Sequence, residues 1–312
     1  MDLVTYLPLD TASNARRFIK LLKPELAIFI KYEFWFNHLA ELKNQNVRTI
    51  LMSGRIHKGQ QFFKPWGKFF RKGLETFNYF YLQDQKSASL LKGIGISRLA
   101  VNGDSRFDRV KAIKEQNKTF PKFETFIGTD KVIILGSSWP AEEKLLNGFI
   151  KEHGDLRFKV IIAPHEIDPK RIAQFSADCQ LECSRMSQWK GETARVMFVD
   201  SIGMLAQIYR YGTVAVVGGG FGAGIHNLLE PAVWGVPVIM GPKYEQFQEA
   251  LGLVAAGGAF PVEGQKDFNA KILSLLEDNQ KQKETSSLAE LYCIENQGAT
   301  EIVMKGIRSM IR

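Results

Sequence analysis

Residues 213–240 read TVAVVGGGFGAGIHNLLEPAVWGVPVIM, an apolar run, a glycine-rich loop, a helical pattern and a second apolar run in direct succession. A buried strand that leads through a loop into a helix and then another strand is typical of a parallel α/β sheet. Glycines let the backbone approach an anion, and the free N–H groups of a helix start supply donors. The spacing matches neither a Walker loop nor a dinucleotide fingerprint. The stretch therefore predicts a phosphate-binding loop of another kind.

The same alternation extends in both directions from this stretch and falls into two series. The later series has strands predicted at 132–135, 158–162, 196–199, 213–217 and 236–240, with helices at 142–152, 169–177, 204–209 and 227–234. The earlier series has strands predicted at 4–7, 26–30, 48–52, 77–82 and 99–102, with helices at 11–22, 34–44, 55–74 and 86–92. Strands that alternate with helices favour parallel sheets with right-handed crossovers. The sequence predicts an α/β protein of two doubly wound, Rossmann-like domains that face a cleft.

A polar segment separates the two series. Residues 119–130 carry Pro121 and Gly128 and show no sustained apolar period, which is typical of an interdomain linker. We predict a first domain over 1–118 and a second over 131–312, whose last helices could pack back on the first domain. The first series starts in mid-pattern at Met1, so we expect its domain to be incomplete at the start.

The charge of the chain points to an anionic partner. The 312 residues carry a formal net charge of +8, and residues 55–72, RIHKGQQFFKPWGKFFRK, hold six Lys or Arg and no acid. Cations beside bulky aromatics suit a helix at a membrane surface, single-strand nucleic-acid binding, or an ordinary amphipathic core helix. No apolar run reaches the roughly 18–20 residues of a membrane span. Residues 1–10 lack a basic start followed by an apolar block, so we expect no signal peptide. We expect a cytoplasmic protein, soluble or peripheral on the membrane.

Metal binding finds little support in the sequence. The three cysteines have no partners at zinc spacing, and no Asp-x-Asp pair occurs. We therefore expect no metal and no cofactor.

Candidate ligand-binding residues follow the strands of the second series. Pro164 and His165 follow one strand, residues 202–204 (Ile202, Gly203 and Met204) follow another, and residues 227–230 (Asn227, Leu228, Leu229 and Glu230) end the glycine loop. Ligands of open parallel sheets bind at this edge. His165 suits a general acid or base, a phosphate donor, or plain polar surface. Glu230 suits either a ribose-binding carboxylate or the second half of a capping box begun by Asn227.

Two charged residues of the first series could face the same cleft. Glu33 follows the strand predicted at 26–30, where a helix-start acid would serve equally well. Arg106 follows the last strand of the series.

With these residues in view, the chain resembles the 3-deoxy-D-manno-oct-2-ulosonic acid (Kdo) transferases of lipopolysaccharide synthesis. The resemblance covers nearly the whole chain and rests on YLPLD at 6–10, YEFWFN at 32–37, NGDSRFD at 102–108 and HNLLEPA at 226–232. It implies a GT-B fold with an acceptor-side first domain and a second domain that binds the CMP-sugar. It also implies inverting, metal-independent transfer of Kdo from CMP-Kdo to a lipid A precursor.

Carried over position by position, the resemblance assigns roles to the candidate residues. Pro164, His165, 202–204 and 227–230 would hold CMP, while Glu33 and Arg106 would stabilise the transition state. The basic and aromatic segment would face the anionic inner membrane on its cytoplasmic side.

The chain departs from the family pattern at several places. Arg106 stands in place of a lysine, His165 of an arginine, Trp139 of a histidine and Met204 of a glutamate. The family's general base, a glutamate near the start of the first domain, would precede Met1. We therefore expect the chain to bind CMP-type ligands but to transfer Kdo poorly or not at all.

Two alternatives stay open. The chain could be another GT-B glycosyltransferase or an epimerase that uses a UDP-sugar, or a non-catalytic donor-binding protein at the membrane surface. Nucleic-acid binding ranks below both because the basic segment is local.

Overall fold

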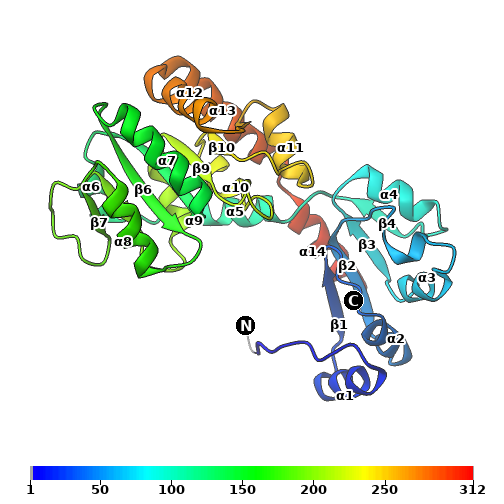
Figure 1. The fold of residues 1–312 in the computed structure, drawn as a ribbon. Helices are drawn as coiled ribbons and strands as arrows, with labels where there is room; N and C mark the ends of the chain where they lie inside the picture. Colours follow the sequence, from blue (N-terminus) through cyan, green and yellow to red (C-terminus); the bar gives the residue numbers. More distant parts are fainter. Residues whose placement is uncertain (1–2, 312) are drawn as a thin grey trace. The chain divides into compact units, whose positions relative to one another are not determined.

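The computed structural model describes residues 3–311, which fold into two compact units (Figure 1). Unit 1 takes the chain up to Asp108 together with the segment from Asn296 onward, and unit 2 is Arg109–Glu295.

Unit 1 is built on a four-stranded parallel sheet. Its strands lie in the order β1 (Leu26–Ile30), β2 (Arg48–Gly54), β3 (Tyr79–Leu82) and β4 (Leu99–Val101). Parallel neighbours need a crossover between them. Here the crossovers carry α2 (Phe36–Asn44), the 3₁₀ turn η1 (Gln61–Phe63) with α3 (Lys68–Leu74), and α4 (Gln85–Lys92), while α1 (Ala12–Leu22) precedes β1. Rings such as Phe62, Phe77 and Phe80 fill the core beneath them.

The other face of this sheet is covered by the end of the chain. Helix α14 (Ala299–Ile311) packs Val303 and Ile307 against Ile50 and Tyr81. Gly306 permits the close approach, since a Cβ there would lie 1.6 Å from the Tyr81 hydroxyl oxygen. A segment more than two hundred positions from β3 thus completes the core of unit 1.

Unit 2 holds a seven-stranded parallel sheet in the order β11-β10-β9-β5-β6-β8-β7. The strands are β5 (Lys131–Ser138), β6 (Phe158–Pro164), β7 (Cys183–Arg185), β8 (Val196–Phe198), β9 (Val214–Val217), β10 (Val238–Met240) and β11 (Ala259–Pro261). Successive β5 side chains alternate between two cores: Ile133 and Leu135 join one, and Val132 and Ile134 the other. Both faces are therefore apolar and covered, which explains the nearly continuous apolar strands.

Helices flank this sheet along the whole unit (Figure 1). They are α6 (Pro121–Ile127), α7 (Pro140–His153), α8 (Pro169–Asp178), α9 (Leu205–Ile208), the 3₁₀ turn η2 (Tyr209–Tyr211), α10 (Leu229–Ala232), α11 (Gln248–Ala255), α12 (Gln265–Glu277) and α13 (Asn279–Glu295). Helix α5 (Arg106–Glu115) carries the chain from unit 1 into unit 2. The predicted class, α/β with two parallel sheets, is confirmed.

Several predicted elements are wrong. Residues 4–7 form no strand: Val4 and Tyr6 are exposed, and no neighbouring strand pairs with this segment within residues 3–311. The single helix predicted over 55–74 is instead a 3₁₀ turn followed by the short α3. Gly67 separates the two, and a Cβ there would lie 2.4 Å from the Gln61 carbonyl oxygen.

The predicted linker is also wrong, because residues 119–130 belong to the body of unit 2. They carry α6, and its Phe123, Phe126 and Ile127 are buried in the core of that unit. The spacing of these three apolar residues is that of a helix, but the polar residues around them make the segment resemble a loop. The boundary between units falls earlier than predicted, at Arg109, within a helix that was not foreseen.

Candidate functional site

The strand order of unit 2 reverses at β5. The chain proceeds from β5 to its neighbour β6 on one side and later returns to β9 on the other side. Loops at the carboxyl ends of β5 and β9 leave the sheet at this switch point, where open α/β sheets bind their ligands. The predicted glycine-rich loop follows β9 and therefore lies at this place.

The glycine loop is tied closely to the end of β5. A Cβ at Gly218 would lie 2.1 Å from the Ser137 carbonyl oxygen, and Gly219 has a positive φ of 93°. The buried Glu142 accepts hydrogen bonds from the Gly219 N–H at 2.9 Å and from the Trp139 N–H at 3.2 Å. One carboxylate thus holds the glycine loop against the start of α7.

Three aromatic rings from three loops meet at the same edge. Trp139 follows β5, His165 follows β6, and His226 lies in the glycine loop. The His165 ring lies 4.6 Å from the Trp139 ring and 4.5 Å from the His226 ring, stacked at 25° in both cases. The Trp139 indole Nε1–H donates to His226 Nε2 at 3.0 Å. The sequence identified His165 as a candidate but not His226. The same signal was available for both, because His165 follows Pro164 at the end of β6 and His226 lies in the glycine-rich loop after β9.

The end of the glycine loop places Glu230 in a half-buried position. Burial raises the pKa of this carboxyl, and the Asn227 amide and the Arg109 charge offset part of that rise. Asn227 Nδ2 donates to Glu230 Oε1 at 3.1 Å, while Asn227 Oδ1 accepts the Leu229 N–H at 3.2 Å. Of the two interpretations left open for Glu230, the capping box is not formed: the two side chains hydrogen-bond each other, and α10 is only four residues long.

The other predicted CMP residues of unit 2 lie along the same sheet edge. Pro164 ends β6, and residues 202–204 form the loop between β8 and α9. Gly203 has a positive φ of 89°, Ile202 is exposed, and the Met204 sulfur accepts a hydrogen bond from the Ser201 hydroxyl at 3.0 Å. The structure thus brings all three predicted segments to one edge of unit 2.

In unit 1, Glu33 and Arg106 also share a sheet edge, because they follow the carboxyl ends of the parallel strands β1 and β4. Three strand spacings separate those strands, roughly 14 Å. The Arg106 guanidinium is held by Asp104, with Nε and Nη2 at 2.9 Å and 2.7 Å from Oδ2.

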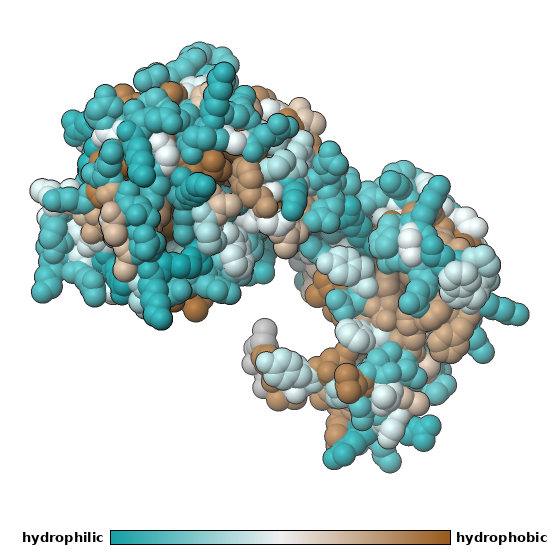
Figure 2. Space-filling view, in the orientation of Figure 1, coloured by the Kyte–Doolittle hydropathy of each residue, from teal (hydrophilic) through white to brown (hydrophobic). Residues whose placement is uncertain are grey.

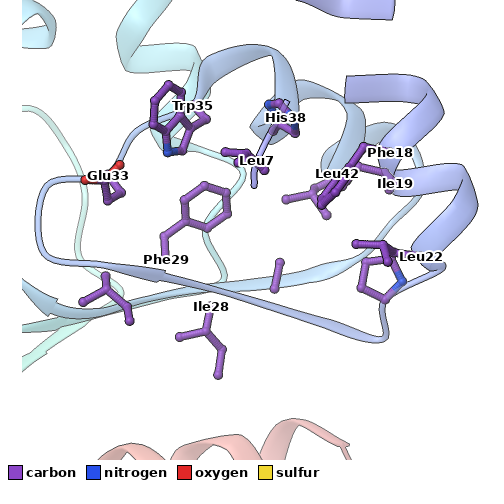
Figure 3. Close-up of a pocket in the computed structure, with 13 residues that line it drawn as sticks. Leu7, Phe18, Ile19, Leu22, Ile28, Phe29, Glu33, Trp35, His38 and Leu42 are labelled. Atoms are coloured by element: carbon purple, nitrogen blue, oxygen red, sulfur yellow. The ribbon is translucent and has the colours of Figure 1, made fainter. Parts of the chain in front are cut away.

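Glu33 is exposed and lines an apolar cavity of about 430 Å³ (Figure 3). Its walls include Trp35 and Phe29, together with Leu22 from α1 and Leu42 from α2.

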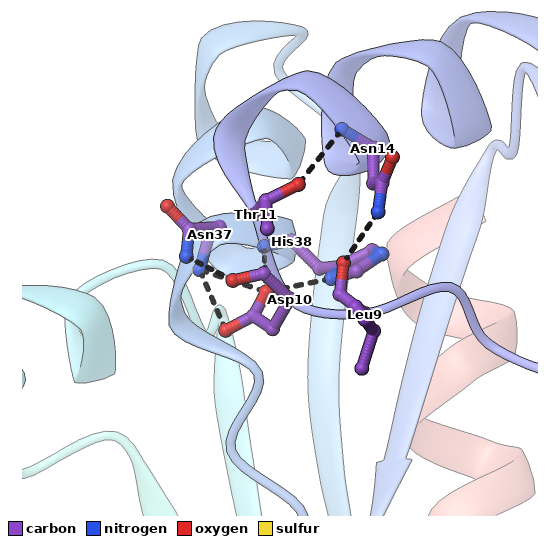
Figure 4. Close-up of polar contacts among 6 residues, drawn as sticks. All are labelled: Leu9, Asp10, Thr11, Asn14, Asn37 and His38. Carbon is purple, nitrogen blue, oxygen red and sulfur yellow. Dashed lines mark hydrogen bonds and ion pairs between the residues drawn. The ribbon is translucent and has the colours of Figure 1, made fainter.

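A partly buried polar cluster fixes the segment before α1 to α2 (Figure 4). Asp10 accepts hydrogen bonds from the Asn37 and His38 N–H groups and lies 2.7 Å from His38 Nδ1. Burial would raise the pKa of Asp10, but the hydrogen bonds from His38 and Asn37 outweigh it and leave that pKa lowered. This cluster positions the Glu33–Asn37 segment at the edge of the sheet.

Comparison with known proteins identifies the relatives of this chain. Residues 1–109 match the family model described as 3-deoxy-D-manno-octulosonic-acid transferase (kdotransferase). The chain is a homologue of the Kdo transferases. It is 26% identical over 286 residues to the transferase of Rickettsia prowazekii and 29% identical over 282 residues to that of Aquifex aeolicus. Both alignments cover 88% of this chain, with 60% of the Rickettsia protein and 72% of the Aquifex protein. The chain thus spans about three-fifths of the length of the Rickettsia relative.

Solved structures confirm the GT-B fold class of this Kdo transferase homologue. A UDP-GlcNAc 2-epimerase from Neisseria meningitidis matches with a TM-score of 0.67 at 14% identity, over 96% of this chain and 80% of the epimerase. A glycosyltransferase from Rickettsia africae matches with a TM-score of 0.56 at 12% identity, over 99% of this chain and 82% of its own. The family match to residues 1–109 ends at the boundary between units 1 and 2.

Proposed function

We propose that unit 2 binds CMP-Kdo and that the chain serves the transfer of Kdo to a lipid A precursor, with inversion and without a metal ion. The convergence of three predicted segments at one edge of the unit 2 sheet carries this proposal. The names of the relatives, which align over most of the chain, support the choice of Kdo as the sugar.

Glu230 is the residue on which recognition of the nucleoside would depend. Within residues 3–311, its carboxylate has one hydrogen-bond partner, the Asn227 amide on Oε1. The second oxygen can accept the hydroxyls of a ribose. A half-buried carboxylate gains more from such bonds than an exposed one because fewer water molecules compete.

The phosphate of the donor would lie against the glycine loop and His165. The loop backbone approaches without side chains, and exposed His165 stands at the end of the neighbouring strand β6. Pro164, residues 202–204 and the segment Asn227–Leu229 would shape the rest of the CMP pocket.

Transfer forms a bond from the acceptor hydroxyl oxygen to the anomeric carbon of Kdo and breaks the bond from that carbon to the phosphate. CMP leaves with the electron pair, and the hydroxyl proton passes to a base. Positive charge develops on the sugar and negative charge on the phosphate. We assign Glu33 to the first charge and Arg106 to the second or to the sugar carboxylate.

The acceptor would be reached at an anionic membrane surface on the cytoplasmic side of the inner membrane. Unit 1 exposes Trp66 and Phe69 among the lysines of 55–72, and Figure 2 shows apolar residues on its visible face. Rings at the acyl boundary and cations at phosphates are the features of interfacial binding. Among the helices within residues 3–311, none is long and apolar enough to cross a bilayer.

Calorimetric titration of the purified chain with CMP and with UMP tests the donor site. We expect CMP to bind more tightly than UMP and its binding to weaken at least tenfold in Glu230→Ala. Exposed Glu277 at the end of α12 supplies the matched control, Glu277→Ala, which should bind CMP as the unaltered chain does. Preference for UMP would redirect the assignment to a UDP-sugar, and equal binding by Glu230→Ala would remove Glu230 from the site.

A further inference from the structure

The ring stack at the unit 2 edge contains a hydrogen bond that fixes a protonation state. An indole N–H can only donate, so the 3.0 Å bond from Trp139 Nε1 requires a lone pair on His226 Nε2. A neutral imidazole with an unprotonated Nε2 carries its proton on Nδ1. Protonation of Nε2 would set two N–H groups against each other and break the bond.

The surroundings of His226 favour the same neutral form. Burial lowers the pKa of His226, and the neighbouring His165 lowers it further. His226 is also held in place from its backbone, since its N–H donates to the Gly218 carbonyl oxygen at 3.1 Å. The ring therefore lies in the glycine loop as a fixed, uncharged N–H donor.

His165 differs from its neighbour in exposure and in hydrogen bonding. Its side chain is exposed, and no hydrogen bond to its ring is found within residues 3–311. One ring it contacts is the Trp139 indole, whose π face favours a cation. The other is the neutral His226, which adds no opposing charge.

The charged groups on the surrounding elements are largely engaged. On α7, Glu142 accepts the Gly219 and Trp139 N–H groups, and Glu143 pairs with Arg171 of α8 at 2.6 Å. Glu166, next to His165 in its own loop, is exposed to solvent. An incoming phosphate would thus be the counter-charge that draws a proton onto His165.

We propose that Trp139 locks His226 as a neutral imidazole with its proton on Nδ1, and that His165 alone takes up a proton when a phosphate group binds at this edge. An anion at this edge then meets one fixed N–H donor, from His226, and one imidazole that becomes a cation on binding, from His165. The lock is a property of the free protein, whereas the identity of the anion as the phosphate of a nucleotide rests on the function proposed above.

Nitrogen-15 NMR of the imidazoles tests the lock without any ligand. The chain has five histidines, so single His→Gln variants assign every signal. We expect His226 to remain the Nδ1–H tautomer from pH 8 to pH 5.5, and to titrate and exchange tautomers in Trp139→Phe. Trp234 donates its indole N–H to the Ala206 carbonyl oxygen at 2.7 Å, so Trp234→Phe is the matched control and should leave His226 locked. An Nε2–H tautomer, or ordinary titration of His226 in the unaltered chain, would overturn the lock.

Calorimetry with CMP at pH 7.5, in buffers of different ionisation enthalpy, counts the protons taken up on binding. We expect a net uptake of protons on binding, abolished in His165→Gln and unchanged in His153→Gln, whose ring packs on Phe149 at the far end of α7. Binding of CMP without proton uptake would refute the role of His165 and leave the donor site intact. If CMP does not bind, the proposed function fails, and the His165 NMR signal is followed with inorganic phosphate instead. A His165 pKa that phosphate leaves unmoved would then refute the switch independently.

Discussion

Replacing Glu142 with alanine should destabilise unit 2 and loosen the glycine loop at the same time. The carboxylate is almost fully buried and accepts two backbone hydrogen bonds, at 2.9 Å from Gly219 and 3.2 Å from Trp139. Hydrogen bonds to a charged group contribute about 1.5–3 kcal/mol each, and the longer bond belongs at the low end. We therefore expect a loss of about 3–5 kcal/mol in the free energy of unfolding of unit 2.

Urea unfolding followed by tryptophan fluorescence measures this loss. Glu142→Gln keeps one acceptor oxygen and should lose roughly half as much, about 2 kcal/mol. Glu277→Ala, on an exposed helix end, is the control and should change stability by less than about 0.5 kcal/mol. CMP affinity should fall in Glu142→Ala because the loop is no longer held. A loss below about 1 kcal/mol in Glu142→Ala would refute the argument that one carboxylate joins the two loops.

Four further predictions concern both units. Burial raises the pKa of Glu230, so its ionisation opposes folding as the pH rises above 4.5, the ordinary pKa of a glutamate. Glu230→Gln should therefore gain stability over the unaltered chain between pH 4 and 7, and a constant difference in urea midpoints would contradict this. Gly136→Ala places a Cβ 1.8 Å from the Tyr209 hydroxyl oxygen, and should cost about 3 kcal/mol or more in thermal unfolding; an unchanged melting temperature would show that the ring moves freely. Because the pKa of Asp10 is lowered in the folded protein, the ionised carboxylate stabilises the fold above pH 3.8, and this stabilisation is lost as the pH falls through the folded-state pKa. Asp10→Ala should therefore lower the free energy of unfolding by about 2–4 kcal/mol at pH 7. Unfolding followed by circular dichroism should show a much smaller loss near pH 2. Trp66→Ala should weaken sedimentation with anionic lipid vesicles roughly tenfold, while equal binding would exclude this ring from the membrane surface.

The pattern of the sequence was sufficient for the fold class and for most elements. Apolar runs at β5, β6 and β9 are buried on both faces, and such strands are recognisable without any partner in view. The pattern failed where local signals and packing disagree. Phe123 and Phe126 lie among polar residues, and only the core of unit 2 shows that they are buried. Conversely, Val4 and Tyr6 have the alternating spacing of a strand, but within residues 3–311 no strand pairs with their segment and both side chains are exposed.

The sequence by itself determined the parts of the site. These are a glycine loop after one buried strand, a histidine after another, and an acid one turn beyond the glycine loop. These follow from local chemistry, because backbone freedom and side-chain type are properties of the residues themselves. Tertiary structure alone decided the connections between them. The order of parallel strands sets which loops are neighbours, and that order brings Glu142 to Gly219 and Trp139 to His226, pairs separated by more than seventy positions. The charge state of His226 is likewise decided by a partner in another loop, Trp139 at the start of α7, since no local pattern specifies which nitrogen an indole will reach.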